Sequence, residues 1–435
     1  MRLSLAMIVK NEQERLAHSL ESVQGLVDEI VVVDTGSTDR TVEIARAHGA
    51  RVEFFPWGED FAAARNAALG FCTGEWILVL DADESIDARD HGLLREALEA
   101  PGVQGYALWI RNYLRSGAII GGEGVAQRND GLYQEGSQFS HHCSRRGLRL
   151  FRAQPEPVYR GRIHELAELY FEERSLSVQS LEAVIHHFGK TDWDRDRAKQ
   201  AGYLQIAKAE AHRCPQEPQA HYNVLQEALM VEDWPAALGA AEAFLRLQGG
   251  APLLVYLGAA KALQGQGRHL EALDYFSPVL AKEPTNAAAL GGRGESLWKL
   301  GRHTEAQADL LQAMESDPGF TLPFITLAGL LRDQGDIEMA RRVLEAGLDQ
   351  NPRDESLWIH LVGLSARRSP ERVAADAWDA LQAVPDGGKG IWHQIVIQSL
   401  LQRDSLAEAA LVLQRGLEAF PGDPELKALE ARLGL

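Results

Sequence analysis

The chain has 435 residues, of which 45% are hydrophobic and 24% are charged. A chain of this length exceeds a single compact core, so two or three domains are expected, and its ordinary composition excludes wholesale disorder. The formal net charge of −18 argues against a nucleic-acid partner and against broad adhesion to anionic lipid, because both interactions depend on clustered Lys and Arg.

Three cysteines, Cys72, Cys143 and Cys214, have neither the number nor the spacing of a disulfide framework or a metal site. This usage suits a reducing compartment, and we expect a cytoplasmic protein. The N-terminal apolar stretch is too short for a signal sequence, and no stretch reaches the roughly 18 apolar residues of a membrane-spanning helix. We therefore expect no transmembrane segment.

The first half of the chain alternates strands with helices. Apolar, β-branched runs predict strands at 3–10, 29–34, 50–56 and 76–80. The first intervening helix carries a buried stripe of Leu16, Leu20 and Val23. Ser37 or Thr38 is expected to cap a second helix that runs to Gly49, and a third helix passes through 61–69. The pattern predicts a parallel α/β sheet.

Polar residues follow three of these strands: Asn11-Glu12, then Asp34-Thr35-Gly36-Ser37-Thr38-Asp39, and finally Asp81-Ala82-Asp83-Glu84. Ligands of open α/β sheets bind outside the carboxyl ends of the strands, so these residues should converge on one edge.

The acidic tetrapeptide 81–84 would repel itself unless a cation or hydrogen bonds stabilised it. Oxygen ligands suit Mg²⁺ or Mn²⁺. If the strand continues through the tetrapeptide, Asp81 and Asp83 point to the same side and can both face a metal-bound diphosphate. A solvated loop is the alternative for so short a motif.

These motifs resemble those of the family 2 glycosyltransferases of GT-A type, and specifically bacterial peptide and protein glycosyltransferases. The resemblance rests on Val9–Glu12, Asp34–Asp39, Asp60-Phe61 with Arg65-Asn66, and Asp81–Glu84, in the family's order and spacing. It implies that residues 1–190 form a GT-A-like, Rossmann-related catalytic domain that uses a nucleotide-sugar donor, for which we expect a UDP-sugar.

The resemblance also implies roles for individual residues. Asp34 would contact the base, Asn11 and Glu12 would line the nucleotide pocket, and Asp81 would lie near the ribose. Asp83 would hold Mn²⁺ or Mg²⁺ beneath the diphosphate, where a metal stabilises the departing nucleoside diphosphate as a Lewis acid.

Arginines supply candidate positive charges for substrate binding. Arg65 adds one such charge or else forms a surface salt bridge. Six arginines between Arg145 and Arg162 could attract a diphosphate or an acidic acceptor, with Arg152 as the candidate, or could cover a solvated strand face.

Three later pieces, Arg149–Arg152, Gly161–Glu165 and His187–Gly189, resemble the subgroup that carries helical repeats. His164 is the candidate for a further metal or diphosphate contact, since imidazole suits Mn²⁺; a structural histidine is the alternative.

Inverting transfer, which the resemblance implies, needs a carboxylate base opposite the leaving group. Glu165 and Glu84 are the candidates, with Glu165 preferred. Between them in the chain, residues 115–145 are rich in Gly and Ser and include Asn129, a composition typical of a mobile loop over the acceptor site.

The second half repeats with a period of 34 residues, which separates Pro284, Pro318 and Pro352, as well as Gly267, Gly301 and Gly335, and Ala272, Ala306 and Ala340. Gly supplies a turn, Ala permits close helix approach, and Pro ends a unit. The pattern resembles tetratricopeptide repeats and predicts an all-α solenoid over 217–435 after a connecting helix at 191–216. Its units are expected at 217–250, 251–284, 285–318, 319–352, 353–386 and 387–423, with a capping helix from Pro424.

Tetratricopeptide arrays commonly dock polypeptides, which favours a metal-dependent transferase with a peptide or protein acceptor recruited by the repeats. Two alternatives stay open. The acceptor is an envelope or lipid-linked saccharide and the repeats serve assembly, including self-association into a homo-oligomer; or the chain is a repeat scaffold that has lost activity.

Overall fold

The computed structural model describes residues 1–117, 120–121, 124–134, 136–188, 193–248, 250–365, 370–384, 391–401, 406–420 and 422–433. The chain forms two compact units. Unit 1 comprises Met1–Tyr113, Gly121–Gly124 and Cys143–Gln266, and unit 2 comprises Leu114–Ile120, Val125–His142 and Gly267–Leu435. The units therefore do not divide at residue 190, because unit 1 contains the first helices of the second half as well as most of the sheet.

A mixed β-sheet has the strand order β3-β2-β1-β4-β10-β6-β11-β5, with β9 paired to β10. Strands β1, β2, β3 and β4 are mutually parallel, as predicted, and β10 runs antiparallel to β4. The strands are β1 Leu3–Val9, β2 Glu29–Asp34, β3 Arg51–Phe54, β4 Trp76–Val79, β5 Glu84–Ile86, β6 Gly105–Leu114, β9 Gln127–Arg128, β10 His141–Arg152 and β11 Val178–His187, and a separate pair joins β7 Ile120–Gly121 to β8 Gly124–Val125.

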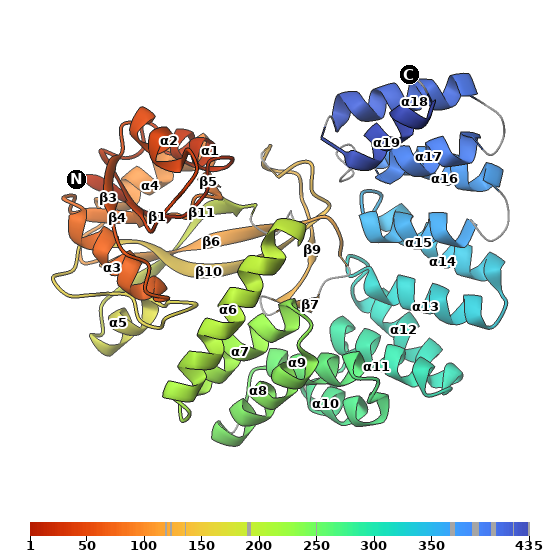
Figure 1. Cartoon of the computed structure of the whole chain (residues 1–435). Coiled ribbons are helices and arrows are strands. Elements are labelled where there is room, and N and C mark those ends of the chain that lie inside the picture. The colour runs from red at the N-terminus through yellow and green to blue at the C-terminus, as the bar shows by residue number, and fades with distance from the viewer. Residues whose placement is uncertain are drawn as a thin grey trace. The chain divides into compact units, whose positions relative to one another are not determined.

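Helices cover both faces of this sheet because successive side chains of a strand point to opposite sides. Leu3, Leu5 and Met7 of β1 share a buried core with α1 (Leu16–Ser22), α2 (Thr41–Ala47) and α4 (His91–Ala97). Ala6 joins the opposite core with α3 (Phe61–Phe71) and α5 (Glu168–Glu173). Figure 1 shows these helices on the two sides of the sheet.

Two local predictions for this domain are wrong. Helix α2 begins at Thr41, where the Asp39 carboxylate accepts the Thr41 N–H, so neither Ser37 nor Thr38 caps it. Strand β4 ends at Val79, and Asp81–Asp83 lie in a turn before β5. The strand alternation expected for Asp81 and Asp83 therefore does not apply.

The second half folds into paired helices in the predicted register. After α6 (Trp193–Arg213), the pairs are α7 Pro218–Met230 with α8 Trp234–Leu247, α9 Leu253–Gly265 with α10 His269–Lys282, α11 Ala287–Lys299 with α12 His303–Ser316, α13 Leu322–Asp333 with α14 Ile337–Gln350, α15 Glu355–Ser365 with α16 Pro370–Ala383, and α17 Ile391–Leu401 with α18 Leu406–Ala419, before α19 Pro424–Leu433. Gly267, Gly301 and Gly335 have φ values of 72°, 76° and 85° at the turns. Ala272, Ala306 and Ala340 are fully buried, as close helix approach requires.

Part of the predicted acceptor loop belongs to unit 2, where it packs against the repeats. The Asp354 carboxylate, fully buried, accepts from the Gly117 N–H at 2.6 Å and from the Thr321 hydroxyl at 2.9 Å. His141 donates from Nε2 to the Gly319 carbonyl at 2.9 Å. Residues 118–119, 122–123 and 135 of the loop lie outside the described residues, and the parts named here are held by hydrogen bonds to the repeats.

Among the described helices, none combines the length and the apolar character needed to cross a membrane. Cys72, Cys143 and Cys214 form no disulfide bond, and burial raises the pKa of Cys72 to about 12.

Close packing inside the array generates a stability prediction at Gly292. A Cβ at this position would lie 2.6 Å from the ring of Phe276, which is only 2% exposed and cannot move aside. We expect Gly292→Ala to lower the free energy of unfolding by about 1–3 kcal/mol, measured by urea unfolding followed by helical circular dichroism. Gly239→Ala is the matched control, because a Cβ added there would meet nothing within 4 Å and Ala favours helix. Equal midpoints for the two variants would contradict close packing at Gly292.

Candidate active site

The loops after β1 and β2 are joined at the carboxyl edge of the sheet. Val9 is in register with Asp34. Asn11 donates its N–H to the Ser37 hydroxyl at 2.9 Å, and its side-chain oxygen accepts the Thr38 N–H at 2.7 Å. Asn11 has a φ of 57°, a left-handed conformation that asparagine tolerates better than most residues. The two loops therefore present one continuous polar edge.

Asp34 and Glu12 lie at this same edge. The Asp34 carboxylate, 2% exposed, accepts the N–H groups of Gly36 and Ser37, each at 3.1 Å. The Glu12 N–H donates to the Thr41 hydroxyl at 2.7 Å. The structure thus brings together the three residues predicted to line a nucleotide pocket, and Asp34 also shapes its own loop.

Five charged side chains of alternating sign form a group that we call the buried charge cluster. It comprises Arg65, Glu84, Arg149 and Glu165, each at most 11% exposed, and Asp81, which is 31% exposed. Arg65 of α3 contacts Asp81 Oδ1 from Nη2 at 2.7 Å and Glu165 from Nε. Arg149 of β10 holds Glu84 with two hydrogen bonds of 2.9 and 3.1 Å and lies 3.7 Å from Asp81 Oδ2. Each arginine therefore serves two carboxylates.

Glu84 also closes the turn that precedes β5. Its Oε2 accepts the Asp81 N–H at 2.9 Å, while its own N–H donates to the Asp81 carbonyl at 3.0 Å. The Glu84 side chain is 1% exposed. These bonds explain why the chain turns after Val79 instead of continuing as a strand.

Burial and the arginines set the ionisation of this cluster. Burial alone would raise the pKa of Asp81, but Arg65 and Arg149 hold that pKa well below its usual range. Burial raises the pKa of Glu84, and Arg149 offsets only part of this effect. The cluster therefore keeps Asp81 charged and leaves Glu84 the more easily protonated of the two.

Asp83 projects to a different set of partners. Its Oδ1 lies 3.4 Å from His187 Nε2, and its Oδ2 lies 3.5 Å from Arg15 Nη1. His187, at the end of β11, contacts the Asn112 side-chain oxygen through Nδ1. A ring whose Nδ1 donates to such an oxygen directs Nε2 toward Asp83, the orientation usual for a metal-ligating histidine.

The histidine beside Asp83 is therefore His187 and not the predicted His164. His164 has a φ of 51° and contacts Glu227 Oε1 of α7 through Nε2 at 2.8 Å. Sequence reasoning noted His187 only as part of a motif, because the pairing of β11 with β5 that carries it to the acidic turn is a property of the folded sheet. Within the described part of the chain, no three His, Cys, Asp or Glu side chains form a ready metal cage.

The structure places Arg152 at the end of β4 that lies away from the acidic turn. Arg152 is in register with Trp76, the first residue of β4, and its guanidinium lies 4.7 Å from the centroid of that ring. It also donates to the Val103 carbonyl at 3.1 Å. Arg152 thus lies at the amino ends of the parallel strands. Arg149, which the sequence indicated only as part of a motif, reaches the acidic turn because β10 runs antiparallel to β4.

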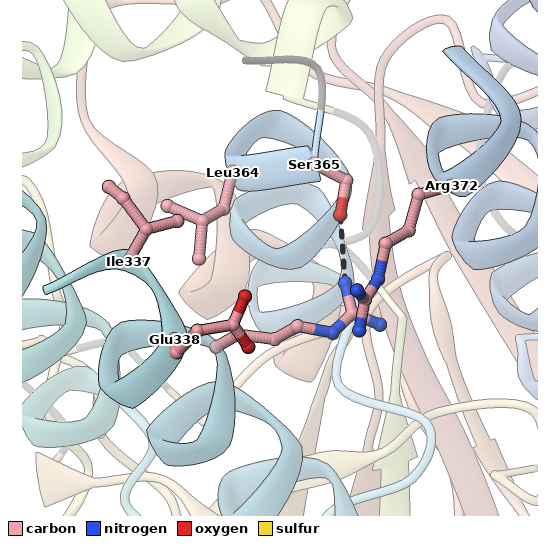
Figure 2. A pocket seen from close by; sticks show the side chains of 6 residues that line it. Ile337, Glu338, Leu364, Ser365 and Arg372 are labelled. Atoms are coloured by element: carbon pink, nitrogen blue, oxygen red, sulfur yellow. Dashed lines mark hydrogen bonds between the residues drawn. The ribbon is translucent and has the colours of Figure 1, made fainter. Parts of the chain in front are cut away.

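A small cavity lies within unit 2, between α14, α15 and α16. It is lined by Ile337, Glu338, Arg341, Leu364, Ser365 and Arg372 (Figure 2). Its volume of about 10 Å³ is close to the minimum for one water molecule. Arg341 is neutralised there by Asp376, with which it forms bonds of 2.7 and 2.8 Å. The cavity is too small for a sugar or a peptide side chain.

Residues 4–139 match the model of glycosyl transferase family 2, and residues 263–321 and 297–363 match the tetratricopeptide repeat. The chain carries a family 2 glycosyltransferase domain followed by tetratricopeptide repeats. The glycosyltransferase domain holds the whole polar edge described above, together with Arg65, Asp81, Asp83 and Glu84, while Arg149, Glu165 and His187 lie beyond the matched residues.

Three curated relatives are similar to parts of this chain. A TPR repeat-containing protein of Synechococcus elongatus is 35% identical over 46% of this chain and 45% of its own length. An uncharacterized glycosyltransferase of Rickettsia typhi is 40% identical over 20% of this chain and 29% of its own length. The prophage-derived glycosyltransferase SunS of Bacillus subtilis is 37% identical over 21% of this chain and 22% of its own length. The chain spans less than half of each relative.

The charge cluster of the glycosyltransferase domain generates a prediction at Arg149. Arg149→Met should lower the free energy of unfolding by about 3–5 kcal/mol at neutral pH, because it leaves Glu84 buried without a cation. Arg145→Met, at an exposed position of the same strand, is the control and should change stability by less than about 0.5 kcal/mol.

The loss of unfolding free energy caused by Arg149→Met should be smaller at mildly acidic pH than at neutral pH. A carboxyl whose folded-state pKa is raised contributes stability below its unfolded pKa and loses it as the pH rises through the folded value. Burial already raises the pKa of Glu84. Removing Arg149, which lowers this pKa, raises it further. Urea unfolding at several pH values measures this dependence. If the loss of unfolding free energy in Arg149→Met does not change with pH, an uncompensated charge on Glu84 is not its cause.

Proposed function

We propose that this protein is a metal-dependent, inverting glycosyltransferase that transfers a sugar from a nucleoside diphosphate donor, with a UDP-sugar as the expected donor. The observation that carries the proposal is the contact of Asp83 with His187 at the carboxyl edge of a family 2 glycosyltransferase domain, beside the loops of Asn11 and Asp34. A carboxylate and an imidazole set against a polar edge suit a metal-bound diphosphate.

The residues present fit a divalent cation such as Mn²⁺. Asp83 and His187 would hold it with one oxygen and one nitrogen, and diphosphate oxygens and water would complete the shell, as is usual where a protein supplies few ligands. The bound ion would supply Lewis-acid stabilisation of the leaving diphosphate. Arg15, 3.5 Å from Asp83, lies where it can neutralise further phosphate charge.

Glu165 is the better candidate for the base that deprotonates the acceptor. Glu84 is 1% exposed, and both of its carboxylate oxygens accept hydrogen bonds from Arg149, one of them also from the Asp81 N–H. Glu165 contacts only Arg65 in the cluster and lies in a loop between α3 and the helical array. A base must reach the acceptor, which favours the carboxylate in the loop.

We further propose that the acceptor is a peptide or protein, that the repeats recruit it, and that the reaction takes place in the cytoplasm. Tetratricopeptide arrays are commonly polypeptide-docking surfaces, and three cysteines without a disulfide bond suit a reducing compartment. The competing acceptor is an envelope or lipid-linked saccharide.

The donor site is tested with a thermal-shift measurement. In the presence of Mn²⁺, UDP-sugars should raise the melting temperature of the wild-type chain, because a ligand that binds only the folded state stabilises it. Asp83→Asn should abolish most of this shift and His187→Gln should reduce it, whereas Asp87→Asn, which keeps a capping side chain four positions further on, should preserve it. No shift with any nucleotide sugar in the wild type would refute the donor site, and an equal shift in Asp83→Asn would refute the metal position.

The acceptor is tested by following a labelled sugar from the donor. The full chain is incubated with a radiolabelled UDP-sugar, Mn²⁺ and a crude extract, and the product is divided between protease-sensitive polypeptide and solvent-extractable lipid. We expect the label in the polypeptide fraction. Label confined to the lipid fraction would replace the protein acceptor with a lipid-linked saccharide, and complete absence of transfer and hydrolysis would support an inactive scaffold.

A further inference from the structure

Residues 161–165 form a short loop that carries both His164 and Glu165. The backbone of Arg160 bonds that of Leu166 in both directions, at 3.2 and 3.0 Å, and so closes the loop. Within it, His164 has a φ of 51°, which costs a residue with a side chain about 1 kcal/mol or more unless its surroundings hold it. The contacts that hold this loop therefore determine where the His164 and Glu165 side chains lie.

One side of the loop is fixed by the glycosyltransferase domain. The Arg162 carbonyl accepts the Phe61 N–H at the start of α3, at 2.9 Å. Glu165 contacts Arg65, which lies one turn further along the same helix. These contacts anchor the two ends of the loop to α3.

The other side is fixed by α7, the first helix after the connecting helix. Asn223 and Glu227, at i and i+4, lie on one face of α7. Asn223 donates to the Ile163 carbonyl at 3.2 Å and is oriented by Gln219, which donates to its side-chain oxygen at 2.9 Å. Glu227 Oε1 contacts His164 Nε2 at 2.8 Å. All of these residues belong to unit 1.

Burial of the Glu227 carboxylate does not favour the folded state. Its side chain is 6% exposed, and its second oxygen, Oε2, is buried without a hydrogen-bond partner. A buried carboxylate oxygen that accepts no hydrogen bond from the protein is unfavourable for folding. His164, by contrast, is 39% exposed, so the pair joins a buried carboxylate to an imidazole that solvent and ligands can reach.

We infer that Glu227 is a positioning residue for the transfer reaction: it accepts the proton of His164 Nε2, fixes the orientation and tautomer of the ring, and leaves Nδ1 as an acceptor for a substrate hydroxyl. A carboxylate that accepts one ring N–H of a histidine sets which nitrogen the other side of the ring presents. Helix α7, predicted as part of the first repeat, is by this inference part of the catalytic domain. The inference rests on the proposed glycosyl transfer for its catalytic consequence, but not for the state of the imidazole.

The test compares Glu227→Gln with the wild-type full chain, and uses Glu242→Gln on α8 as the matched control. Imidazole nitrogen NMR of histidine-labelled protein, with the His164 signals assigned by their loss in His164→Gln, reports the tautomer. We expect the Nε2–H form in the wild type and in Glu242→Gln, and a mixture of tautomers in Glu227→Gln. The turnover number for donor hydrolysis should fall at least about tenfold in Glu227→Gln with little change in the KM for the donor.

The melting temperature separates positioning from structural support. Because Glu227 is a buried carboxylate with an unpaired oxygen, Glu227→Gln should melt at or above the wild-type temperature while turnover falls. A melting temperature that falls together with turnover, or an unchanged His164 tautomer in Glu227→Gln, would overturn the inference. If the wild type hydrolyses no nucleotide sugar, the proposed function fails, and the NMR comparison still decides whether Glu227 controls His164.

Discussion

The buried charge cluster is the constraint on which the architecture of the candidate active site depends. Two arginines lie among three carboxylates, and the five side chains come from α3, the turn after β4, β5, β10 and the 161–165 loop. Buried charges are tolerated only when each has a partner, so none of these segments can move alone without leaving a charge unpaired. The cluster holds the acidic turn in place, and Asp83 of this turn contacts His187 and Arg15.

The helical array contributes to both compact units. In unit 1, α7 holds the loop of His164 and Glu165 through Asn223 and Glu227. In unit 2, the Asp354 carboxylate of the later repeats binds Gly117, in the segment between β6 and β10. The repeats therefore support segments of the strand-containing half of the chain, a role separate from any docking of an acceptor.

The placement of arginines and histidines shows where sequence reasoning about the site stops. Arg149 and Arg152 belong to one sequence motif. Arg149 contacts the acidic turn at the carboxyl end of β4, whereas Arg152 lies over Trp76 at the amino end of β4. The difference follows from the antiparallel direction of β10. Similarly, Asp83 contacts His187 because β11 pairs with β5, and no local sequence pattern predicts that pairing.

The sequence by itself determined the parallel strands, the convergence of Asn11 and Asp34 on one edge, and the register of the repeats, because apolar β-branched runs and the 34-residue period of Gly, Ala and Pro can be read directly from the order of residues. Only the tertiary structure decided the partners of the acidic turn and the contribution of α7. Those contacts join residues far apart in the chain, such as His164 with Glu227 and Glu84 with Arg149, and they depend on strand order and helix packing. Buried apolar strands and the apolar faces of the helices define the fold, while the pairing of buried charges defines the site.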